Sequence, residues 1–174
     1  MFFCKKASKE IFEGLTFENI TKKDIMPLTA IMKRAFDEDY RLHFGKGTGG
    51  PDGYDNGEFI RKWYFHKGVK AYKISKDGVL IGAIALWINK NNVNYLGNVF
   101  VDSNLQDKGI GLKIWRFVEQ KYPNTLKWKT DTPLFSKRNH HFYINKCGFK
   151  LIEITNPDDI EKGQYILEKD MKNK

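Results

Sequence analysis

Residues 95–122 read YLGNVFVDSNLQDKGIGLKIWRFVEQKY, and the fold can be built outward from them. Aromatic and β-branched residues dominate 95–101, which is typical of a strand, whereas 102–108 are polar. From Gly109 onward, apolar residues recur at helical spacing, at Ile110, Ile114, Phe117 and Val118. The segment therefore predicts a strand, a turn and an amphipathic helix over 107–122.

The turn has the features of an anion site. Gln106, Lys108, Gly109 and Gly111 place small residues and a cation at the first turn of the predicted helix. The first N–H groups of a helix have no partner within the helix, and this end carries a partial positive charge. A phosphate is therefore the expected ligand of the turn.

Spacing excludes two common phosphate motifs. A dinucleotide fingerprint requires G-x-G-x-x-G directly after the strand, but Ile114 stands at the third glycine and seven residues separate Val101 from Gly109. That motif fails even though Asp131 follows about twenty residues on. A Walker loop requires G-x-x-x-x-G-K-[ST], which neither this turn nor GKGTGG at 45–50 supplies. The pattern that remains is Q-x-x-G-x-G, beginning five residues after Val101.

A second motif lies at 139–149, which reads NHHFYINKCGF. With Val101, the Q-x-x-G-x-G pattern resembles the acetyl-CoA motif of the GCN5-related N-acetyltransferase (GNAT) superfamily. The second segment resembles the F-Y-x-K-x-G-F pattern at the end of the last core helix in many members, through Phe142, Tyr143, Lys146, Gly148 and Phe149. Either motif alone is weak, but both occur in order about 30 residues apart with one predicted strand between them.

The resemblance, which spans Leu15 to about Lys169, implies an α/β (mixed α+β) fold. The length of the chain suits one domain, 1–174, in which the weakly patterned segment 1–14 is a lead-in that is either loose or packed on the surface. The resemblance implies a twisted mixed sheet of six to seven strands, about four flanking helices, and strands 93–101 and 125–130 that splay apart. The pantetheine arm of acetyl-CoA would lie in that slot against the backbone of Phe100 and Val101. Its pyrophosphate would rest on the turn formed by Gln106, Asp107, Lys108, Gly109, Ile110 and Gly111. Gly97 would mark a bulge that opens the slot.

The resemblance also implies roles for three residues of the last helix. Asn139 would offer its amide to pantetheine, or simply face solvent. Lys146 would face the cofactor phosphates, or favour the helix C-terminus through the dipole. Tyr143 would be the acid that protonates the departing thiolate, because a phenol stays protonated at neutral pH. The alternative for Tyr143 is an aromatic side chain that packs on the helix.

The remaining elements follow from periodicity and turn residues. Strands are predicted at 15–20, 70–75, 79–88, 149–154 and 164–169, a first helix from Thr21 to near Asp37, a short helix at 58–65, and a helix from Ser136 to Lys146. Short connections predict antiparallel hairpins among 70–101, and the intervening helix predicts that 125–130 is parallel to 93–101. The glycine-rich segment 38–57 is either an acceptor-side wall, with Tyr40, His43, Tyr54 and Asp55 as contacts, or a disordered insertion.

Direct acetyl transfer to an amine also needs a base, which the sequence does not identify. The candidates are Asp131, Asp55, Glu58, His43 or a water chain. His140 and His141 near Cys147 do not predict a metal site, because adjacent helix residues point about 100° apart and no further ligands cluster.

Composition limits the class of partner. The chain has 174 residues and a net charge of +9, with the lysines dispersed and no nucleic-acid motif beside them, so nucleic acid is not the expected partner. No apolar run reaches the roughly 20 residues of a membrane span, the N-terminus does not resemble a secretory signal, and two cysteines suggest a reducing cytoplasm. The expected reaction acetylates a primary amine of a small molecule. A peptide amine, or a non-catalytic CoA-binding module, is the alternative, and monomer and homodimer both stay open.

Overall fold

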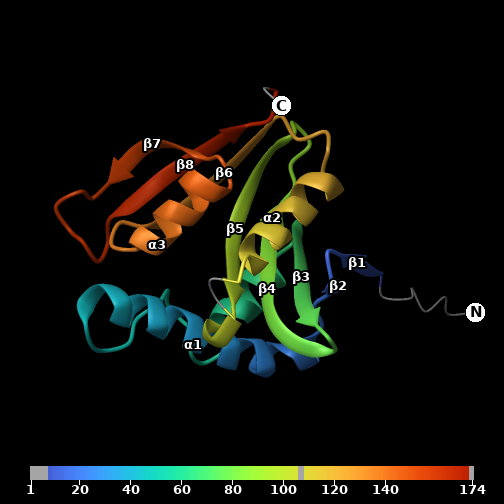
Figure 1. The fold of residues 1–174 in the computed structure, drawn as a ribbon, viewed down its shortest axis with the longest axis horizontal. Helices are drawn as coiled ribbons and strands as arrows, with labels where there is room; N and C mark the ends of the chain where they lie inside the picture. Colours follow the sequence, from blue (N-terminus) through green and yellow to red (C-terminus); the bar gives the residue numbers. More distant parts are fainter. Residues whose placement is uncertain (1–7, 106–107, 173–174) are drawn as a thin grey trace, which may run out of the picture.

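The computed structural model describes residues 8–105 and 108–172. These form a mixed sheet flanked by helices (Figure 1). The strands are β1 (Lys9–Phe12), β2 (Leu15–Asn19), β3 (Val69–Lys76), β4 (Val79–Trp87), β5 (Val93–Val101), β6 (Lys127–Pro133), β7 (Lys150–Thr155) and β8 (Gln164–Asp170). The helices are α1 (Ile25–Phe44), α2 (Ile110–Lys121) and α3 (Lys137–His140), with 3-10 turns η1 (Lys22–Asp24) and η3 (Ser103–Leu105) and π-helical segments η2 (Ile60–Tyr64) and η4 (His141–Lys146). No helix in this described part is long and apolar enough to cross a membrane.

The sheet has the order β1-β2-β3-β4-β5-β6-β8-β7, which gives eight strands where six to seven were expected. The additional strand is β1, in the segment predicted to be a lead-in. It pairs with β2 through a tight turn at Glu13 and Gly14, both of which have positive φ. Such a two-residue turn matches the twist of paired strands, so a sequence with weak patterning still forms a hairpin.

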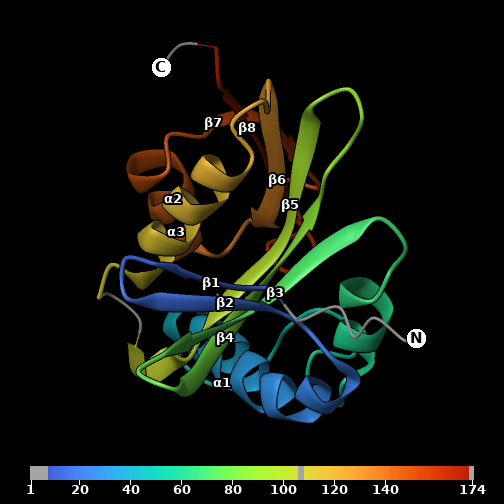
Figure 2. The ribbon, with the colours of Figure 1, turned by 90° about the vertical axis from the view of Figure 1, so that its right-hand side faces the viewer.

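The strands β5 and β6 are parallel, as predicted, but they pair over a short stretch. Their register runs from Val93 opposite Lys127 to Tyr95 opposite Lys129. Beyond this point the two strands diverge (Figure 1), and Figure 2 shows β5 continuing past the end of β6. The predicted splay is therefore confirmed, and it leaves one edge of β5 without a neighbouring strand.

A β-bulge occurs at Gly97, at the point where the strands begin to part. Leu96 is opposite Leu86 and Asn98 is opposite Ala85, so Gly97 is the extra residue of β5. The Trp87 ring covers this glycine, because a Cβ built on Gly97 would lie 2.0 Å from a ring carbon of Trp87. The predicted bulge is confirmed, and its glycine is required by the indole above it.

We expect Gly97→Ala to lower the free energy of unfolding by about 1–3 kcal/mol, because the new methyl group overlaps the Trp87 ring. Urea unfolding followed by circular dichroism measures this change. In a Trp87→Leu background the same substitution should cost less, since the clashing ring is gone. An equal cost in both backgrounds would show that the overlap with Trp87 is not the cause.

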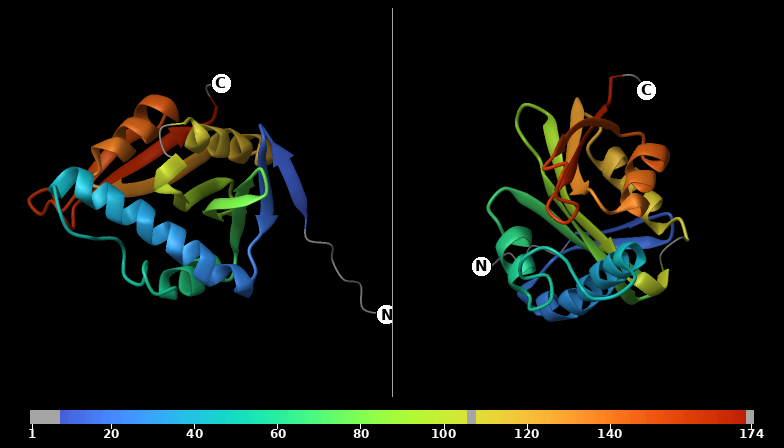
Figure 3. Two further views of the ribbon diagram at one scale, coloured as in Figure 1. Left: turned by 60° about the horizontal axis from the view of Figure 1, so that its bottom comes forward. Right: turned by 90° about the vertical axis from the view of Figure 1, so that its left-hand side faces the viewer.

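Two apolar cores lie on opposite faces of the sheet. One combines α2 and η4 with β2–β6 and includes Trp115, Trp128 and Phe149, and the other packs α1 and η2 on β4 and β5. Figure 3 shows α1 on one side of the sheet and α2 on the other. The gap between β5 and β6 therefore lies between the face of the sheet that α2 and η4 cover and the face that α1 and η2 cover.

The helix α1 is longer than predicted, since it ends at Phe44 and not near Asp37. Its stop is Gly45, which has a φ of 78° and donates its N–H to the carbonyl oxygen of Arg41 at 2.8 Å. The segment 38–44 precedes a run of glycines and was predicted as part of the loop 38–57, but it contains no glycine or proline, and its residues are good enough helix formers to continue α1. The loop therefore begins at Gly45.

The segment 142–149 departs from the F-Y-x-K-x-G-F pattern by one residue, because two residues and not one separate Tyr143 from Lys146. The structure accommodates the additional residue in the π-helical segment η4. Within it, the N–H of Cys147 donates to the carbonyl oxygen of Phe142, five residues back, at 3.0 Å. One-turn π-bulges are typical of functional sites, and here the bulge sets the position of Tyr143.

Candidate active site

A cleft lies between the C-terminal part of β5, α1, the first turn of α2 and the α3–η4 segment, and it brings most of the predicted cofactor residues together. Its lining includes Phe100, Val101, Gly109, Ile110, Gly111, Asn139, Tyr143 and Lys146. Lys108 is exposed and does not line the cleft. Gln106 and Asp107 lie outside the described residues. Which of these residues bind a cofactor remains a prediction, but their convergence agrees with it.

The turn before α2 has a geometry suited to a phosphate group. Gly109 is the N-cap residue, with a φ of 72°, no side-chain cap and open space where a Cβ would be. The backbone N–H groups of the first turn of α2 are therefore not covered by a capping side chain. Gly111 is close-packed instead, since a Cβ there would lie 2.9 Å from the Phe142 ring. A cradle of this kind fits the pyrophosphate of coenzyme A.

Tyr143 lies in the cleft beyond this turn. Only 7% of its surface is exposed. Burial, together with the nearby Cys147 and Asp131, raises the pKa of its phenol above the ordinary value, with a smaller opposing effect of the Thr130 hydroxyl. The hydroxyl group is therefore protonated at neutral pH, which is the state that a general acid requires.

Asn139 and Lys146 lie on the α3–η4 side of the cleft. The Asn139 side chain donates from Nδ2 to Oγ1 of Thr132 at 3.1 Å. This bond fixes the amide and leaves its carbonyl oxygen as the group that a ligand can use. Lys146 is exposed at the cleft, so both of its predicted roles stay open.

The α1 side of the cleft was missed by the sequence analysis. It is formed by Ala35, Phe36 and Asp39, while α3 and η4 add Arg138, His141 and Phe142, and Val99, Leu105 and Leu112 line the β5–α2 part. The signal that could have found the first group is the helical spacing of apolar residues in α1, which continues to Phe44. Ala35 and Phe36 lie within the predicted helix but belong to no motif, whereas Asp39 lies in 38–44, which was predicted as a loop.

The C-terminal end of α1 contacts α3 in what we call the α1–α3 bridge, formed by Asp39, Tyr40, His43, Phe135 and Arg138. The buried Asp39 carboxylate lies 3.4 Å from Nη2 of Arg138. Nδ1 of His43 is 2.8 Å from the carbonyl oxygen of Asp39, and Nε2 of His43 accepts the Lys137 N–H at 2.9 Å. The rings of Tyr40 and His43 pack on Phe135. Both nitrogens of His43 are therefore used, which argues against it as the base.

The loop after α1 packs against that helix. The Tyr54 hydroxyl group donates to Oδ1 of Asp37 at 2.6 Å, and Lys33 donates to Oδ2 of the same carboxylate at 2.5 Å. Burial and the hydrogen bond to Asp37 raise the pKa of Tyr54 to about 12. Gly49 and Gly50 pack on the rings of Tyr40 and Tyr54. These contacts favour an ordered wall over a disordered insertion.

We expect Tyr54→Phe to lower the free energy of unfolding by about 1 kcal/mol and to make 45–57 more sensitive to protease, because Asp37 loses one hydrogen-bond donor. Limited proteolysis with mass spectrometry measures the second effect. Tyr165→Phe is the control, since no hydrogen bond of its hydroxyl group is seen within the described residues. Equal cleavage of the two variants would show that the Tyr54 hydroxyl group does not hold the loop.

Of the other candidate bases, Asp131 is the one beside Tyr143. It is exposed on β6, yet the surrounding protein desolvates its carboxylate enough to raise its pKa. Asp131, Asp55 and Glu58 are all exposed and none of them lines the cleft, so what distinguishes Asp131 is its electrostatic effect on Tyr143. No group of three or more His, Cys, Asp or Glu side chains that could hold a metal ion occurs among the described residues.

Comparison with known proteins agrees with this geometry. The sequence profile of the Acetyltransferase (GNAT) family matches residues 31–149, and the chain belongs to that family. A relative from Bacillus subtilis (strain 168), the uncharacterized protein YrkN, is 39% identical over 114 residues, which are 65% of this chain and 60% of that protein. The chain thus matches about 60% of the length of this relative.

Solved structures share the fold. The PaiA N-acetyltransferase of Thermoplasma acidophilum, in complex with coenzyme A, has a TM-score of 0.65 and 18% identity, covering 90% of this chain and 98% of that one. The spermidine N-acetyltransferase of Vibrio cholerae, with CoA and spermine, has a TM-score of 0.65 and 12% identity over 91% and 96%. The ribosomal-protein-S18-alanine N-acetyltransferase of Escherichia coli has a TM-score of 0.65 and 12% identity over 90% and 94%. The mixed α/β fold and the acetyl-CoA class of donor expected from the sequence are thereby confirmed for the family.

Proposed function

We propose that this protein is an N-acetyltransferase that moves the acetyl group of acetyl-CoA directly to a primary amine of a small molecule. The observation that carries this proposal is a cleft that runs from the turn at Gly109 and Gly111, past the part of β5 that is not in the ladder with β6, to Tyr143. A phosphate cradle, a strand edge and a protonated phenol in that order match the parts of an acetyl-CoA thioester and the acid that its thiolate needs.

The residues fit the donor in three places. The first turn of α2 would hold the pyrophosphate through backbone N–H groups, because Gly109 provides no side chain to block them. Beyond the Leu96 carbonyl oxygen, which accepts from the Thr130 hydroxyl group, β5 is not paired with β6, so backbone groups near Val99 and Phe100 would pair with the amides of pantetheine. When bound, acetyl-CoA supplies an activated acyl group on a good leaving thiol. Asn139 would add its amide oxygen from the opposite wall.

Tyr143 would give its proton to the departing thiol sulfur. Its pKa is raised by burial, so the proton is present at neutral pH and is transferred only when a strongly basic thiolate develops. Asp131, on the exposed face of β6, is close enough to the phenol to raise its pKa, and it would receive a proton from the incoming amine. The two proton transfers would thus occur at two nearby groups, of which Tyr143 lines the cleft.

The preference for a small acceptor over a peptide rests on the α1–α3 bridge. This contact joins the C-terminal end of α1 to α3 through the Lys137 N–H and the Arg138 guanidinium group. The loop 45–57 is held against α1 by Tyr54. A long chain would have to displace these contacts in order to lie along the cleft, whereas a small amine would not.

A thiol-release assay tests the proposal. The full-length protein is incubated with acetyl-CoA and a panel of small amines and short peptides, and products are identified by mass spectrometry. The expected result is amine-dependent thiol release with an acetylated small amine as product. Acetyl-CoA binding without release in the presence of any amine would contradict an enzymatic role, and acetylation confined to peptides would contradict the small acceptor.

A further inference from the structure

Three partly exposed aromatic side chains form a continuous surface on the α1 side of the sheet, which we call the aromatic wall: Trp63, Trp87 and Tyr95. The rings of Trp63 and Trp87 meet edge to face, with centroids 6.3 Å apart. Trp87 and Tyr95, on paired positions of β4 and β5, do the same at 6.2 Å. None of the three was assigned a role by the motifs of the sequence.

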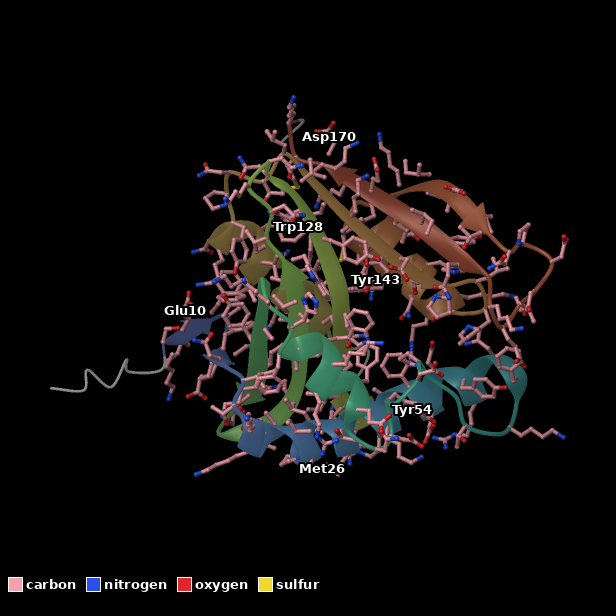
Figure 4. The ribbon with its side chains drawn as sticks, turned by 180° about the vertical axis from the view of Figure 1, so that it is seen from behind. Glu10, Met26, Tyr54, Trp128, Tyr143 and Asp170 are labelled. Atoms are coloured by element: carbon pink, nitrogen blue, oxygen red, sulfur yellow. The ribbon has the colours of Figure 1, made fainter. Side chains whose placement is uncertain are left out.

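The aromatic wall borders the gap in which transfer would occur. Trp87 lies over Gly97, the bulge residue at which β5 leaves β6. Tyr95 is opposite Lys129 in the parallel register, so the two side chains share a face, and Asp131 follows Lys129 by two residues on that face. Two residues that are two positions apart on a strand, as Lys129 and Asp131 are, lie about 7 Å apart. Seen from the side of η2, Tyr143 is in the gap between β5 and β6 (Figure 4).

A fixed hydrogen bond lines the gap beside Tyr143. The fully buried Tyr64 donates its hydroxyl hydrogen to Oδ1 of Asn98 at 2.6 Å. Burial and the neighbouring Tyr143 raise the pKa of Tyr64, which keeps it a donor. Asn98 is the residue after the bulge, so this amide follows directly on the glycine that the Trp87 ring covers.

The charges around the wall do not suit an acceptor with several positive charges. Glu168 is already paired with two lysines, at 2.6 Å from Lys127 and 3.1 Å from Lys129. Nζ of Lys62 lies 4.7 Å from the centroid of the Trp63 ring. Asp131 forms no ion pair with any residue in the part of the chain that is described, and its carboxylate is exposed on this face. The Asp131 carboxylate, with lysines near it, can therefore balance the charge of one ammonium group of an acceptor and not of several.

We propose that the acceptor is a monoamine with an aromatic or flat apolar body, which packs on Trp63, Trp87 and Tyr95 and directs its amine between Asp131 and Tyr143. The inference rests on the proposed N-acetyltransferase function and specifies its acceptor. Aromatic faces bind apolar rings and attract a cation, and the carboxylate adds a charge of the opposite sign. A polyamine would leave its remaining ammonium groups among lysines.

The transfer step balances with these groups. The ammonium group of the acceptor gives one proton to the Asp131 carboxylate and on to solvent, and the neutral nitrogen then attacks the thioester carbonyl carbon. The new C–N bond forms as the C–S bond breaks, with the electron pair of the broken bond remaining on sulfur. Tyr143 protonates that sulfur, and its phenolate is reprotonated by the second proton that the nitrogen loses. The products are an N-acetyl amine and coenzyme A, with no redox change.

The test compares 2-phenylethylamine with 2-cyclohexylethylamine, spermidine and a short lysine peptide as acceptors. We expect kcat/KM for 2-phenylethylamine to exceed that for spermidine and for the peptide at least tenfold. Trp87→Leu and Trp63→Leu should each raise the KM for 2-phenylethylamine about tenfold, which is the loss of affinity expected when one aromatic ring contact is removed. Asp131→Asn should lower kcat/KM by a similar factor or more.

Two controls separate these effects from general damage. Phe65→Leu removes an exposed ring outside the wall, and Asp77→Asn removes a carboxylate from the distant β3–β4 turn. Both should leave KM for 2-phenylethylamine unchanged. Stabilisation of every variant by acetyl-CoA in a melting experiment shows that the donor site is intact.

The outcomes distinguish this inference from the function on which it rests. Efficient acetylation of spermidine or the peptide with little of 2-phenylethylamine, or wall variants with an unchanged KM, would overturn the inference and leave the N-acetyltransferase intact. A tryptophan fluorescence titration with 2-phenylethylamine in the presence of coenzyme A measures acceptor binding without turnover. Saturable binding that Trp87→Leu weakens, but with no thiol release for any amine, would support the subsite and overturn the enzymatic proposal.

Discussion

Replacing Tyr143 with phenylalanine is expected to lower kcat by about 10²–10⁴-fold, the range for loss of a positioned general acid. The substitution keeps the ring, which packs on Phe142 and Phe149, and removes only the hydroxyl group. Affinity for acetyl-CoA should change little, because the phosphate cradle at Gly109 is untouched. Since burial raises the pKa of this phenol, its deprotonation should not limit the wild-type rate below about pH 10. Steady-state kinetics across pH measures both effects.

The matched control is Tyr72→Phe. Tyr72 is also buried, and its hydroxyl group is 2.8 Å from that of Tyr122, away from the cleft. It therefore reports the cost of removing a buried, hydrogen-bonded hydroxyl group with no part in the reaction. Equal turnover of Tyr143→Phe and the wild type would remove the acid role, and an equal loss in both variants would assign the effect to stability.

Gly109→Glu is expected to abolish measurable binding of acetyl-CoA. Its carboxylate would occupy the space in which the first turn of α2 receives a phosphate group. Two like charges about 4 Å apart repel by about 4 kcal/mol at an effective dielectric constant near 20, which is about a thousandfold in Kd. Calorimetric titration with acetyl-CoA measures the loss. Gly111→Glu should do the same, although a side chain there also displaces the Phe142 ring.

Gly78→Glu provides a closely matched control for Gly109→Glu. Gly78 has a φ of 78° against 72° for Gly109, and both have open space where the Cβ would be. Both variants therefore carry the same charge change and a similar backbone cost of about 1–2 kcal/mol. Only Gly109 lies at the cleft, so retained binding in Gly109→Glu would contradict the phosphate assignment.

Local patterns were sufficient for much of the fold. The strand, turn and helix of 95–122 were predictable because alternation and helical spacing are visible within about ten residues, and the parallel pairing of β6 followed from the intervening helix. The C-terminal end of α1 was not predictable in this way. Residues 38–44 stand next to a run of glycines and so resemble part of a loop. The helix nevertheless continues through them and ends only at Gly45.

The donor half of the site was easier to predict than the acceptor half for a physical reason. Phosphate binding needs a helix N-terminus and small residues that are adjacent in the chain, such as Gly109 and Gly111. The acceptor side joins residues that are far apart, for example Trp63 with Trp87 and Asp39 with Arg138. No spacing rule links such residues, because their proximity depends on the packing of α1 and η2 on the sheet. The base candidates could be narrowed only after Asp131 and Tyr143 were seen to be neighbours.

The short pairing of β5 with β6 has a mechanical consequence. The sheet ladder joins the two strands only from Val93 to Tyr95, and beyond it the Thr130 hydroxyl group of β6 donates to the carbonyl oxygen of Leu96 at 2.8 Å. Trp128 of β6 is opposite Asn94 at this closed end of the gap, and its ring meets that of Trp115 from α2 at 5.4 Å. The two strands are therefore held together at one end only, where β6 also packs on α2 through two buried indoles. A change of side-chain volume at Trp115 or Trp128 would shift β6 at that end and so alter the width of the gap, although neither residue lines the cleft.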